Sequence, residues 1–489
     1  MRICVLNASY EQSKSDFRGH DPYCDPSRHL PEHTFERHLI EKATAVRQVR
    51  DLAAKGFDAF VNLCDGAWDE DRAGIEVVQA LERFGQAFTG AGSGFYEPTR
   101  EIMKMGCRYA GIDTPGFVFA RTADDAALAL AQLRFPMIVK HPNSYGSVGM
   151  TRLARVETER DLRAQLRKTI ASFGGALVEE FIEGREFTVL VAEARDGETA
   201  PVTYAPMEAR FPSGETFKHF DLKWVDYDQM TWVPVDDADL AARLRDVSAR
   251  FFATLGGSGY GRCDLRLAAD GALHMLEINP NCGIFYPEGS YGSADLILAE
   301  DPAGHRGFLE HALQSALRRR RRAEKVWEVR YDAKGGYALH AARELRVGEV
   351  IDRWEERAQH LVTRAHVEAH WNAQQKRWFR QYAWPLTDEV HVMWSDRPEE
   401  WKPLDHGCDP NAWLSGLDLV ARRDIAPGER ITVDYATFCG PLMEDFECRC
   451  GSPLCRGVIR AADHLAPFVK QRYGAHVSDY VRTAQERTR

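Results

Sequence analysis

The stretch that decides the fold of the first half of the chain runs from residue 259 to residue 280 and reads GYGRCDLRLAADGALHMLEINP. The pair Asp270 and Gly271 predicts a turn between two strands. Glu277 and Asn279 then share a face of the second strand, because side chains two residues apart point the same way, and Asp264 on the first strand comes within reach. Three oxygen ligands predict a magnesium site next to nucleotide phosphates; an ordinary hairpin with exposed acids is the alternative.

Strand and helix signals alternate on both sides of this stretch. Residues 3–7 (ICVLN) and 57–63 (FDAFVNL) look like buried parallel strands, with a helical stretch around Phe35 to Lys55 between them. This is a βαβ start, as in a Rossmann-like half-domain. The alternation continues to about Leu317, where five consecutive arginines follow at 318–322. They predict a solvated helix end that leads into a linker, with an anion or nucleic-acid contact as the alternative.

Two further motifs accompany the hairpin. Lys140 ends a strand, FPMIV at 135–139, and precedes the glycine loop YGSVGM at 145–150, while residues 176–189 read ALVEEFIEGREFTV. Together these motifs resemble the ATP-grasp superfamily, in its D-alanine–D-alanine ligase branch, along most of residues 1 to 315. The resemblance implies an ATP site made of the following residues: Lys104, Lys140 and Lys223 at the phosphates, Gly146, Ser147 and Gly149 in the closing loop, Glu179, Glu180, Phe181 and Ile182 at the base, and Glu186 at the ribose.

The resemblance also implies the reaction. A carboxylate attacks the γ-phosphate of ATP, an acyl-phosphate forms, and an amine displaces the phosphate to give an amide; Arg262 would stabilise the acyl-phosphate and the tetrahedral intermediate. The substrate stretches depart from the family. Residues 280–284 read PNCGI where relatives carry a Thr-Ser-Pro-Gly-Met type run, and residues 7–11 (NASYE) replace a glycine-rich start. These departures argue against cell-wall D-alanine ligation.

Four cysteines near the C-terminus suit a metal. Cys448, Cys450 and Cys455 form a C-x-C-x4-C pattern, and Cys408 is the candidate for a fourth ligand. Structural zinc is tetrahedral and takes four such thiolates. Free cysteines on a loop are the alternative, although the spacing is unusually tight for that. We expect every cysteine of the chain to be reduced.

Three segments around these cysteines share a second resemblance. Residues 336–351 (GYALHAARELRVGEVI), 405–411 (DHGCDPN) and 424–435 (DIAPGERITVDY) resemble a SET domain, with a post-SET zinc loop, over about residues 331 to 460. The resemblance implies S-adenosylmethionine held by Gly336, Ala338, Asp405 and His406, and Tyr435 at the methyl-transfer channel. The sequence has Ala338, Asp405 and Gly407 where relatives have Gly, Asn and Ser. Val433 stands where many relatives carry Tyr or Phe, which suggests a roomy channel and more than one methyl added.

The expected architecture is an α/β ATP-grasp fold followed by a β-rich SET domain. It comprises a Rossmann-like subdomain (1–98), an ATP-grasp domain of two α+β subdomains (99–316), an arginine-rich linker (317–330), the SET domain (331–445), the post-SET zinc loop (446–460) and a helical tail (461–489). The formal charge of −10 and pI near 6.0 argue against a nucleic-acid binder. No run of 18 apolar residues and no signal peptide is visible, so we expect a cytoplasmic protein without membrane contact.

The preferred function is a bifunctional enzyme, a ligase and an amine or lysine N-methyltransferase, using ATP, Mg²⁺, S-adenosylmethionine and Zn²⁺. Its substrate is expected to be an amino acid, an amine or a peptide. One alternative is a protein-lysine methyltransferase acting on a basic protein, whose ATP-grasp part attaches or recognises the substrate. Another is a scaffold that uses ATP and zinc only structurally. A homodimer is expected only from the habit of relatives.

Overall fold

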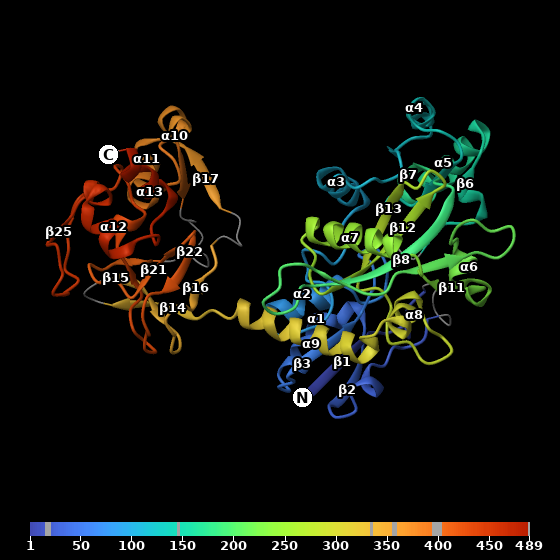
Figure 1. Cartoon of the computed structure of the whole chain (residues 1–489), viewed down its shortest axis with the longest axis horizontal. Helices are drawn as coiled ribbons and strands as arrows, with labels where there is room; N and C mark the ends of the chain where they lie inside the picture. Colours follow the sequence, from blue (N-terminus) through green and yellow to red (C-terminus); the bar gives the residue numbers. More distant parts are fainter. Residues whose placement is uncertain (15–20, 144–146, 333–335, 355–358, 394–402, 488–489) are drawn as a thin grey trace. The chain divides into compact units, whose positions relative to one another are not determined.

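The computed structural model describes residues 1–14, 21–143, 147–332, 336–354, 359–393 and 403–487. The chain divides into two compact units, Met1–Ala323 and Glu324–Arg489 (Figure 1). The first unit is an α/β assembly of three sheets, and the second consists of short strands with a few helices. No helix of the described part has the length and apolar character needed to cross a membrane.

The first unit begins with a small parallel sheet of order β2-β1-β3. Its elements are β1 (Arg2–Ala8), β2 (Thr34–Ile40), α1 (Ala45–Ala53), β3 (Ala59–Leu63) and α2 (Ile75–Arg83). The expectation of a helix from Phe35 was wrong, because residues 34–40 are a strand that pairs in parallel with β1. Only the part from Lys42 is helical, first as a 3-10 turn (Lys42–Thr44) and then as α1. The stretch ends in apolar Leu39 and Ile40, and pairing with the buried β1 decides its conformation.

The second sheet is antiparallel, with the order β4-β7-β5-β6. It is built from β4 (Phe117–Ala120), β5 (Met137–Lys140), β6 (Arg155–Val156) and β7 (Ala176–Glu180). The helices α4 (Ala126–Gln132) and α5 (Glu159–Phe173) pack on it. Their apolar residues form one core with those of the strands, including Val139, Leu162 and Val178. This layer holds Lys140 and Glu179 at strand ends.

The third sheet has the order β11-β10-β8-β12-β13, and β9 pairs with β8. Its strands are β8 (Gly184–Ala192), β9 (Val202–Thr203), β10 (Met207–Arg210), β11 (Thr231–Pro234), β12 (Tyr260–Ala268) and β13 (Leu273–Pro280). β12 and β13 pair antiparallel, so the predicted pair of strands around Asp270 is confirmed. The register shifts between Asp264 and Leu265, and such irregularities often re-aim side chains beside active sites.

Five helices complete the first unit around these sheets: α3 (Arg100–Ala110), α6 (Phe220–Trp224), α7 (Ala238–Thr254), α8 (Ser293–Glu300) and α9 (Gly304–Ala323). The arginine run lies in the last turns of α9, so the expected linker from residue 317 is still helical there. Arg318 donates to the carbonyl of Ala194 at 2.7 Å, and Arg319 pairs with Glu193 at 2.8 Å. These two arginines therefore fasten the helix to its own unit.

The second unit is β-rich, as predicted. Its strands are β14 (Trp327–Asp332), β15 (Gly336–Ala341), β16 (Val350–Asp352), β17 (His360–Thr363), β18 (Trp384–Pro385), β19 (Val390–Met393), β20 (Asp405–His406), β21 (Ala412–Ser415), β22 (Asp418–Ala421), β23 (Thr432–Val433), β24 (Phe446–Glu447) and β25 (Val458–Ile459). They form short sheets of two or three strands around one apolar core. Helices α10 (Arg364–His370) and α11 (Ala373–Tyr382) follow β17.

The C-terminal segment is helical, with α12 (Pro467–Tyr473) and α13 (Asp479–Arg487). It is more than a polar tail, because Val469, Tyr473 and Val481 are buried in a cluster with Ala436. Tyr473 also donates a hydrogen bond to Asp434 at 2.8 Å. The segment therefore supports the stretch that contains Tyr435.

Candidate functional sites

A buried carboxylate joins two of the lysines that sequence motifs assign to phosphates. Glu179, at the end of β7, is 1% exposed and forms ion pairs with Lys104 of α3 and, at 2.6 Å, with Lys140 of β5. Burial alone would raise the pKa of Glu179, but the two lysines hold it well below its ordinary value. Burial lowers the pKa of Lys104. Glu179 therefore pairs with both lysines and lies between them.

The three predicted magnesium ligands converge across β12 and β13. Asp264 lies opposite Glu277 in the register, and Asn279 Nδ2 donates to Asp264 Oδ2 at 3.3 Å and to Glu277 Oε1 at 3.4 Å. Burial raises the pKa of both carboxyl groups, but Arg262 beside Asp264 and Arg100 beside Glu277 outweigh it, and both values are lowered. Two anionic carboxylates and one amide oxygen are hard donors, so this set fits Mg²⁺.

Arg262 is fixed by the same strand pair. Its guanidinium contacts both oxygens of Asp264, at 3.2 and 2.9 Å, and its third nitrogen donates to Ser293 Oγ at 2.9 Å. Such a bidentate pair holds a guanidinium in one orientation. The neighbouring carboxylate raises the pKa of Arg262 against the effect of burial, so its charge is permanent. This is a preorganised positive group next to the metal ligands.

The predicted ribose ligand is ion-paired on both oxygens. Glu186 Oε1 lies 2.8 Å from Lys218 Nζ, and Oε2 lies 2.8 Å from Arg266. Arg266 also donates to the carbonyl of Ile182 at 2.7 Å, which ties the segment after β7 to β12. Phe181 packs against Phe217 with ring centroids 6.0 Å apart. Both oxygens of Glu186 are therefore already paired. To bind a ribose hydroxyl, Glu186 would have to give up a contact with Lys218 or Arg266.

Part of the predicted closing loop is described. Ser147 has a φ of 63°, and its hydroxyl donates to the carbonyl of Lys218 at 2.9 Å. Gly149 has a φ of 68°, a conformation that glycine adopts without strain. Gly146 lies outside the described residues. The loop therefore touches the same segment that carries Lys218.

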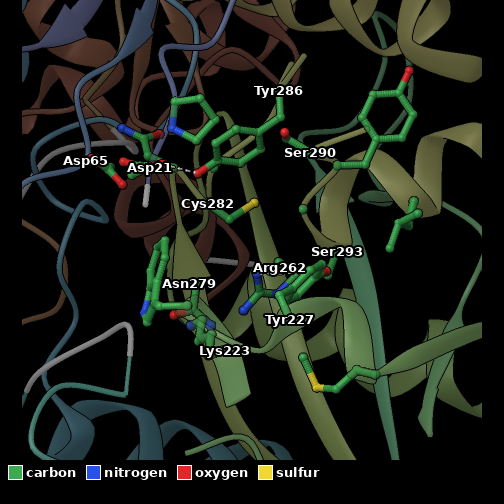
Figure 2. Close-up of a pocket in the computed structure, with 18 of the residues that line it drawn as sticks. Asp21, Asp65, Lys223, Tyr227, Arg262, Asn279, Cys282, Tyr286, Ser290 and Ser293 are labelled. Atoms are coloured by element: carbon green, nitrogen blue, oxygen red, sulfur yellow. Dashed lines mark hydrogen bonds between the residues drawn. The ribbon is translucent and has the colours of Figure 1, made fainter. Parts of the chain in front are cut away.

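Two cavities meet at Lys223. The smaller one is lined by most of the predicted nucleotide residues: Lys140, Ser147, Glu179, Glu180, Phe181, Ile182, Glu186, Lys223, Asp264 and Glu277. Its volume of about 80 Å³ is well below the usual size of ligand pockets. The larger cavity, of about 710 Å³, is lined by Lys223, Arg262 and Asn279 and extends from them past Cys282 toward Asp21 and Asp65 (Figure 2). Burial lowers the pKa of Lys223 to about 8.

In the second unit, strand pairing brings the three predicted motifs together. Asp405 and His406 of β20 pair in parallel with Thr432 and Val433 of β23. β15 lies beside both segments, because Leu339 N–H donates to the carbonyl of Pro403 and the carbonyl of Leu339 accepts from Ile431 N–H. Gly336, with a φ of 75°, and the fully buried Ala338 belong to this strand. The predicted S-adenosylmethionine residues therefore come from neighbouring strands.

The polar groups of this site support a cationic, amine-bearing cofactor. Asp405 Oδ2 pairs with Arg430 at 3.2 Å, and burial raises the pKa of Asp405. Burial also lowers the pKa of His406 to about 4, so this imidazole is neutral. Its Nδ1 accepts the Tyr435 N–H at 3.2 Å. A carboxylate beside strand backbone suits the amino group of S-adenosylmethionine.

Tyr435 lies among aromatic rings. The ring centroids of His406, Phe438 and Phe446 lie 5.3, 5.7 and 5.9 Å from that of Tyr435. Its hydroxyl donates to the carbonyl of Leu404 at 2.7 Å, and burial raises the pKa of the phenol. The hydroxyl is therefore neutral, held in place and suited to orienting a neighbouring group.

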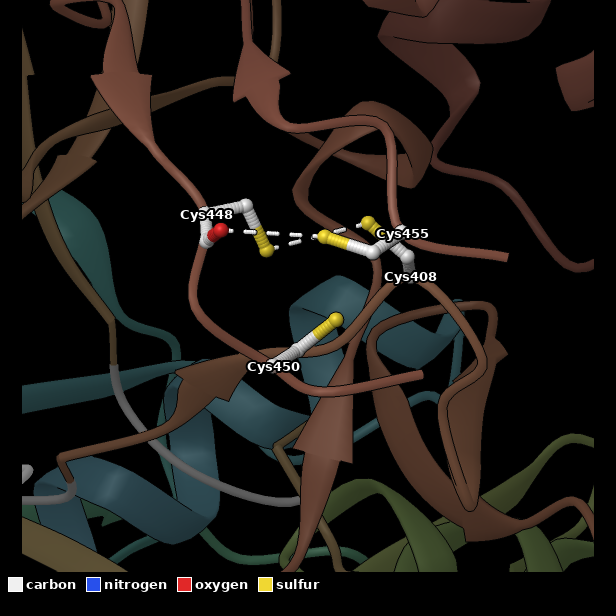
Figure 3. A group of neighbouring side chains, drawn as sticks. All are labelled: Cys408, Cys448, Cys450 and Cys455. Carbon is white, nitrogen blue, oxygen red and sulfur yellow. Dashed lines mark hydrogen bonds between the residues drawn. The ribbon is translucent and has the colours of Figure 1, made fainter. Parts of the chain in front are cut away.

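The four predicted zinc cysteines meet at one point. The Sγ atoms of Cys408, Cys448, Cys450 and Cys455 all lie within 4.8 Å of one another (Figure 3). Cys408 Sγ is 3.8 Å from Cys448 Sγ and accepts a backbone N–H from Arg456 at 3.4 Å. Four converging thiolates fit tetrahedral zinc. Cys408 also lies 3.3 Å from His406 Nε2, so the cluster supports the cofactor site.

Several residues of both sites were not found from the sequence. Lys218 pairs with Glu186 and lies 3.7 Å from Asp264, Arg100 pairs with Glu277 at 2.7 Å, and Arg456 makes bidentate contacts of 2.6 and 2.8 Å with Asp434. The sequence held one signal for Arg266. Arg262, Asp264 and Arg266 are spaced two residues apart on one strand, which predicts that the three side chains share a face. No local pattern marks Lys218 or Arg100.

Comparison with known families agrees with both halves. Residues 107–286 match the family model described as the D-ala D-ala ligase C-terminus, and residues 336–436 match the SET domain. The chain is 28% identical over 244 residues to the D-alanine–D-alanine ligase of Cupriavidus necator, covering 49% of this chain and 71% of the relative. It is 29% identical over 243 residues to the ligase of Ralstonia pickettii, covering 49% and 70%.

Solved structures of D-alanine–D-alanine ligases also match. The enzyme from Bacillus anthracis has a TM-score of 0.49 at 19% identity, covering 66% of this chain and all of that one. The enzyme from Coxiella burnetii has a TM-score of 0.48 at 14% identity, covering 66% and 95%. From the family models, this chain contains the D-alanine–D-alanine ligase type of ATP-grasp region, followed by a SET domain and a cysteine cluster that suits zinc.

Proposed function

We propose that the chain is a bifunctional enzyme, an ADP-forming carboxylate–amine ligase joined to an S-adenosylmethionine-dependent amine N-methyltransferase. The observation that carries the ligase is the position of Lys223, which lines both the cavity of the nucleotide residues and the large cavity. Asp264 lines the first cavity and Arg262 lines the second. The two side chains are joined by a hydrogen bond from Arg262 to Asp264. A phosphate at this junction would face a substrate in the large cavity.

The charged side chains have defined tasks in amide formation. An oxygen of the substrate carboxylate bonds to the γ-phosphorus of ATP as the bond to ADP breaks, and Lys140, Lys223 and Lys104 counter the charge of the phosphates. A neutral amine then bonds to the carbonyl carbon, the phosphate leaves, and the amine loses a proton. Arg262 stabilises the negative oxygen of this step, since it is already oriented by Asp264. Bound Mg²⁺ would supply further positive charge at the phosphates.

The aromatic surroundings of Tyr435 support amine methylation. A lysine-like amine with an ordinary pKa near 10.4 has to be neutral to attack a methyl group, and apolar surroundings favour the neutral form. S-adenosylmethionine would supply the electrophilic methyl group. Tyr435 would orient the amine, while Asp405 and the backbone of β15 hold the cofactor. This reading takes an amino acid, amine or peptide as substrate for both units.

A single experiment tests both activities. The purified full chain is incubated with ATP, Mg²⁺ and labelled S-adenosylmethionine together with pools of amino acids, polyamines, peptides and basic proteins. Products are read by mass spectrometry, and ADP release is measured in parallel. A small product with both an amide mass gain and a methyl group supports the proposal. Label only on protein lysines, without substrate-dependent ADP, would favour a protein methyltransferase, and neither signal would favour a scaffold.

A further inference from the structure

The large cavity of the first unit has ends of opposite charge. Figure 2 shows Lys223 and Arg262 on one side of Cys282, and Asp21 and Asp65 on the other. Its volume of about 710 Å³ lies within the usual range for sites that enclose a whole small-molecule ligand. A pair of alanine-sized substrates would leave most of this space empty. The cavity therefore fits a longer molecule, with an anionic group near Arg262 and a cationic group at the far end.

The far end carries more negative than positive charge. Four carboxylates line it, Asp21, Asp65, Glu70 and Glu97, against the single guanidinium of Arg72. Arg72 lies 2.9 Å from Asp65, 2.7 Å from Glu70 and 3.8 Å from Asp21. If all four carboxylates are ionised, three unit charges remain uncompensated there. Their field favours a cation in the cavity.

Two buried polar atoms in this wall lack a partner among the described residues. Glu97 accepts the N–H of Trp68 on one oxygen at 3.2 Å, and its other oxygen, Oε1, has none. Asn281 is 4% exposed; its oxygen accepts the N–H of Ala91, and its Nδ2 has no acceptor. Buried polar groups are normally hydrogen-bonded. Both atoms are closed to solvent, so Glu97 and Asn281 would have to turn toward the cavity before an ammonium or a carboxylate oxygen could pair with them.

An organic cation fits this wall better than a metal ion. Among the described residues, only the four cysteines of the second unit bring three or more His, Cys, Asp or Glu ligand atoms within 4.8 Å of one another. No three carboxylates of the cavity therefore bring their oxygens close enough together to share one metal ion. Trp224, Trp232 and Tyr291 also line the cavity, and each already has a cationic side chain near its ring, from Lys223, Lys218 and Arg28.

We propose that the amine substrate of the ligase is a diamine, either a basic amino acid or a polyamine, whose second, charged amino group is anchored at the acidic end by Glu97 and Asp65. This inference rests on the proposed ligase function and names the substrate class of that site. The anchored amine stays protonated, while the other amine reaches the acyl-phosphate in its neutral form. That amine forms the C–N bond as the carbon–oxygen bond to phosphate breaks, and its proton is released. The product keeps a free amine, the type of group that the second unit would methylate.

Binding tests the inference separately from turnover. The full chain is titrated calorimetrically with lysine, ornithine, cadaverine and spermidine, and with norleucine and pentylamine as neutral-ended matches. We expect the diamines to bind about tenfold to a hundredfold more tightly than their matches, because a charge-assisted hydrogen bond is lost in the latter. Lysine binding above cadaverine would identify a basic amino acid, and the reverse a polyamine. Equal binding of cadaverine and pentylamine, or no binding of any diamine, would overturn the inference.

Matched variants test whether Glu97 and Asp65 bind the second amino group. Glu97→Gln keeps the shape of the side chain but removes its charge, and we expect it to abolish the preference for diamines. Asp65→Asn provides a second variant should Glu97→Gln fold poorly. Glu300→Gln is the control, since this exposed residue ends α8, whose other end lines the cavity. An unchanged preference in both anchor variants would contradict the assignment.

Parallel ADP assays distinguish a failure of the diamine assignment from a failure of the ligase function. ADP release with neutral-ended amines but not with diamines would leave the ligase standing and remove the diamine. Diamine binding without ADP release for any carboxylate would support the cavity assignment and count against the ligase.

Discussion

The two candidate sites treat charge in opposite ways. The ligase site places Arg262, Asp264 and Glu277 on the strand pair β12–β13, with Lys223 of α6 beside them, so that positive groups face the place where phosphate charge would move. The methyl-transfer site instead surrounds Tyr435 with rings and a neutral His406. Phosphoryl transfer needs preorganised charge, whereas methylation of an amine needs that amine uncharged. The chemistry of each step explains the difference.

The largest expected effect follows from loss of zinc, which should inactivate the second unit and spare the first. Removal of zinc by a zinc-selective chelator in excess Mg²⁺, or Cys448→Ser, should abolish methylation and leave ADP release unchanged, because Cys408 would hold the metal and contacts His406. Structural zinc contributes folding free energy directly. Elemental analysis should find one zinc per chain. Methylation activity should fall in proportion to the zinc that is removed. Ser452→Ala, in the same loop, is the control, and methylation by zinc-free protein would contradict this expectation.

Next in size is the loss of Arg262. Arg262→Ala should lower ADP release by about 10²–10³-fold, as for other groups that stabilise a developing oxyanion, with methylation unaffected. It also leaves Asp264 buried without its partner, which costs about 3–5 kcal/mol of stability. Thermal unfolding therefore has to accompany the assay. Arg262→Lys keeps the charge as a second variant, and Arg160→Ala on the exposed face of α5 is the control. ADP release unchanged in a folded Arg262→Ala protein would remove this residue from catalysis.

The two activities should respond to pH in opposite directions. Lys223 loses its proton as pH rises through about 8, so carboxylate activation should fall about tenfold from pH 7 to 9. Methylation should rise over the same range, because more of the acceptor amine is neutral. Activation is measured by trapping the acyl-phosphate with hydroxylamine, which stays neutral over this range. Lys223→Arg should move the fall to higher pH, and parallel profiles for both activities would be inconsistent with the proposed roles.

The smallest effect concerns the number of methyl groups. Val433 is fully buried and follows the residue that pairs with Asp405. A small side chain there leaves room for a methylated amine to turn and react again. The wild-type protein should give products with more than one methyl by mass spectrometry, and Val433→Tyr should shift them toward one. Strict monomethylation by the wild-type chain would refute the roomy channel.

The parts that were predictable have strong local patterns. The strand pair of residues 259–280 follows from alternation and a turn, and the cysteine cluster follows from close spacing. Residues 34–40 were misread as helix because their pattern is mixed and their partner β1 lies 32 residues away. The tail was read as polar because Val469 and Val481 acquire their apolar partners only in the folded unit.

The sequence by itself determined which chemical groups are present and their order: the lysines, the oxygen ligands, the four thiols and the tyrosine. Only the tertiary structure decided how they are paired. Glu179 lies between Lys104 and Lys140, Lys218 beside Glu186, and the acidic wall from residues 21 to 97 opposite Arg262. Such pairings depend on distances through space between segments far apart in the chain. Local periodicity fixes the direction of a side chain on its own strand, but only packing fixes which charge it meets.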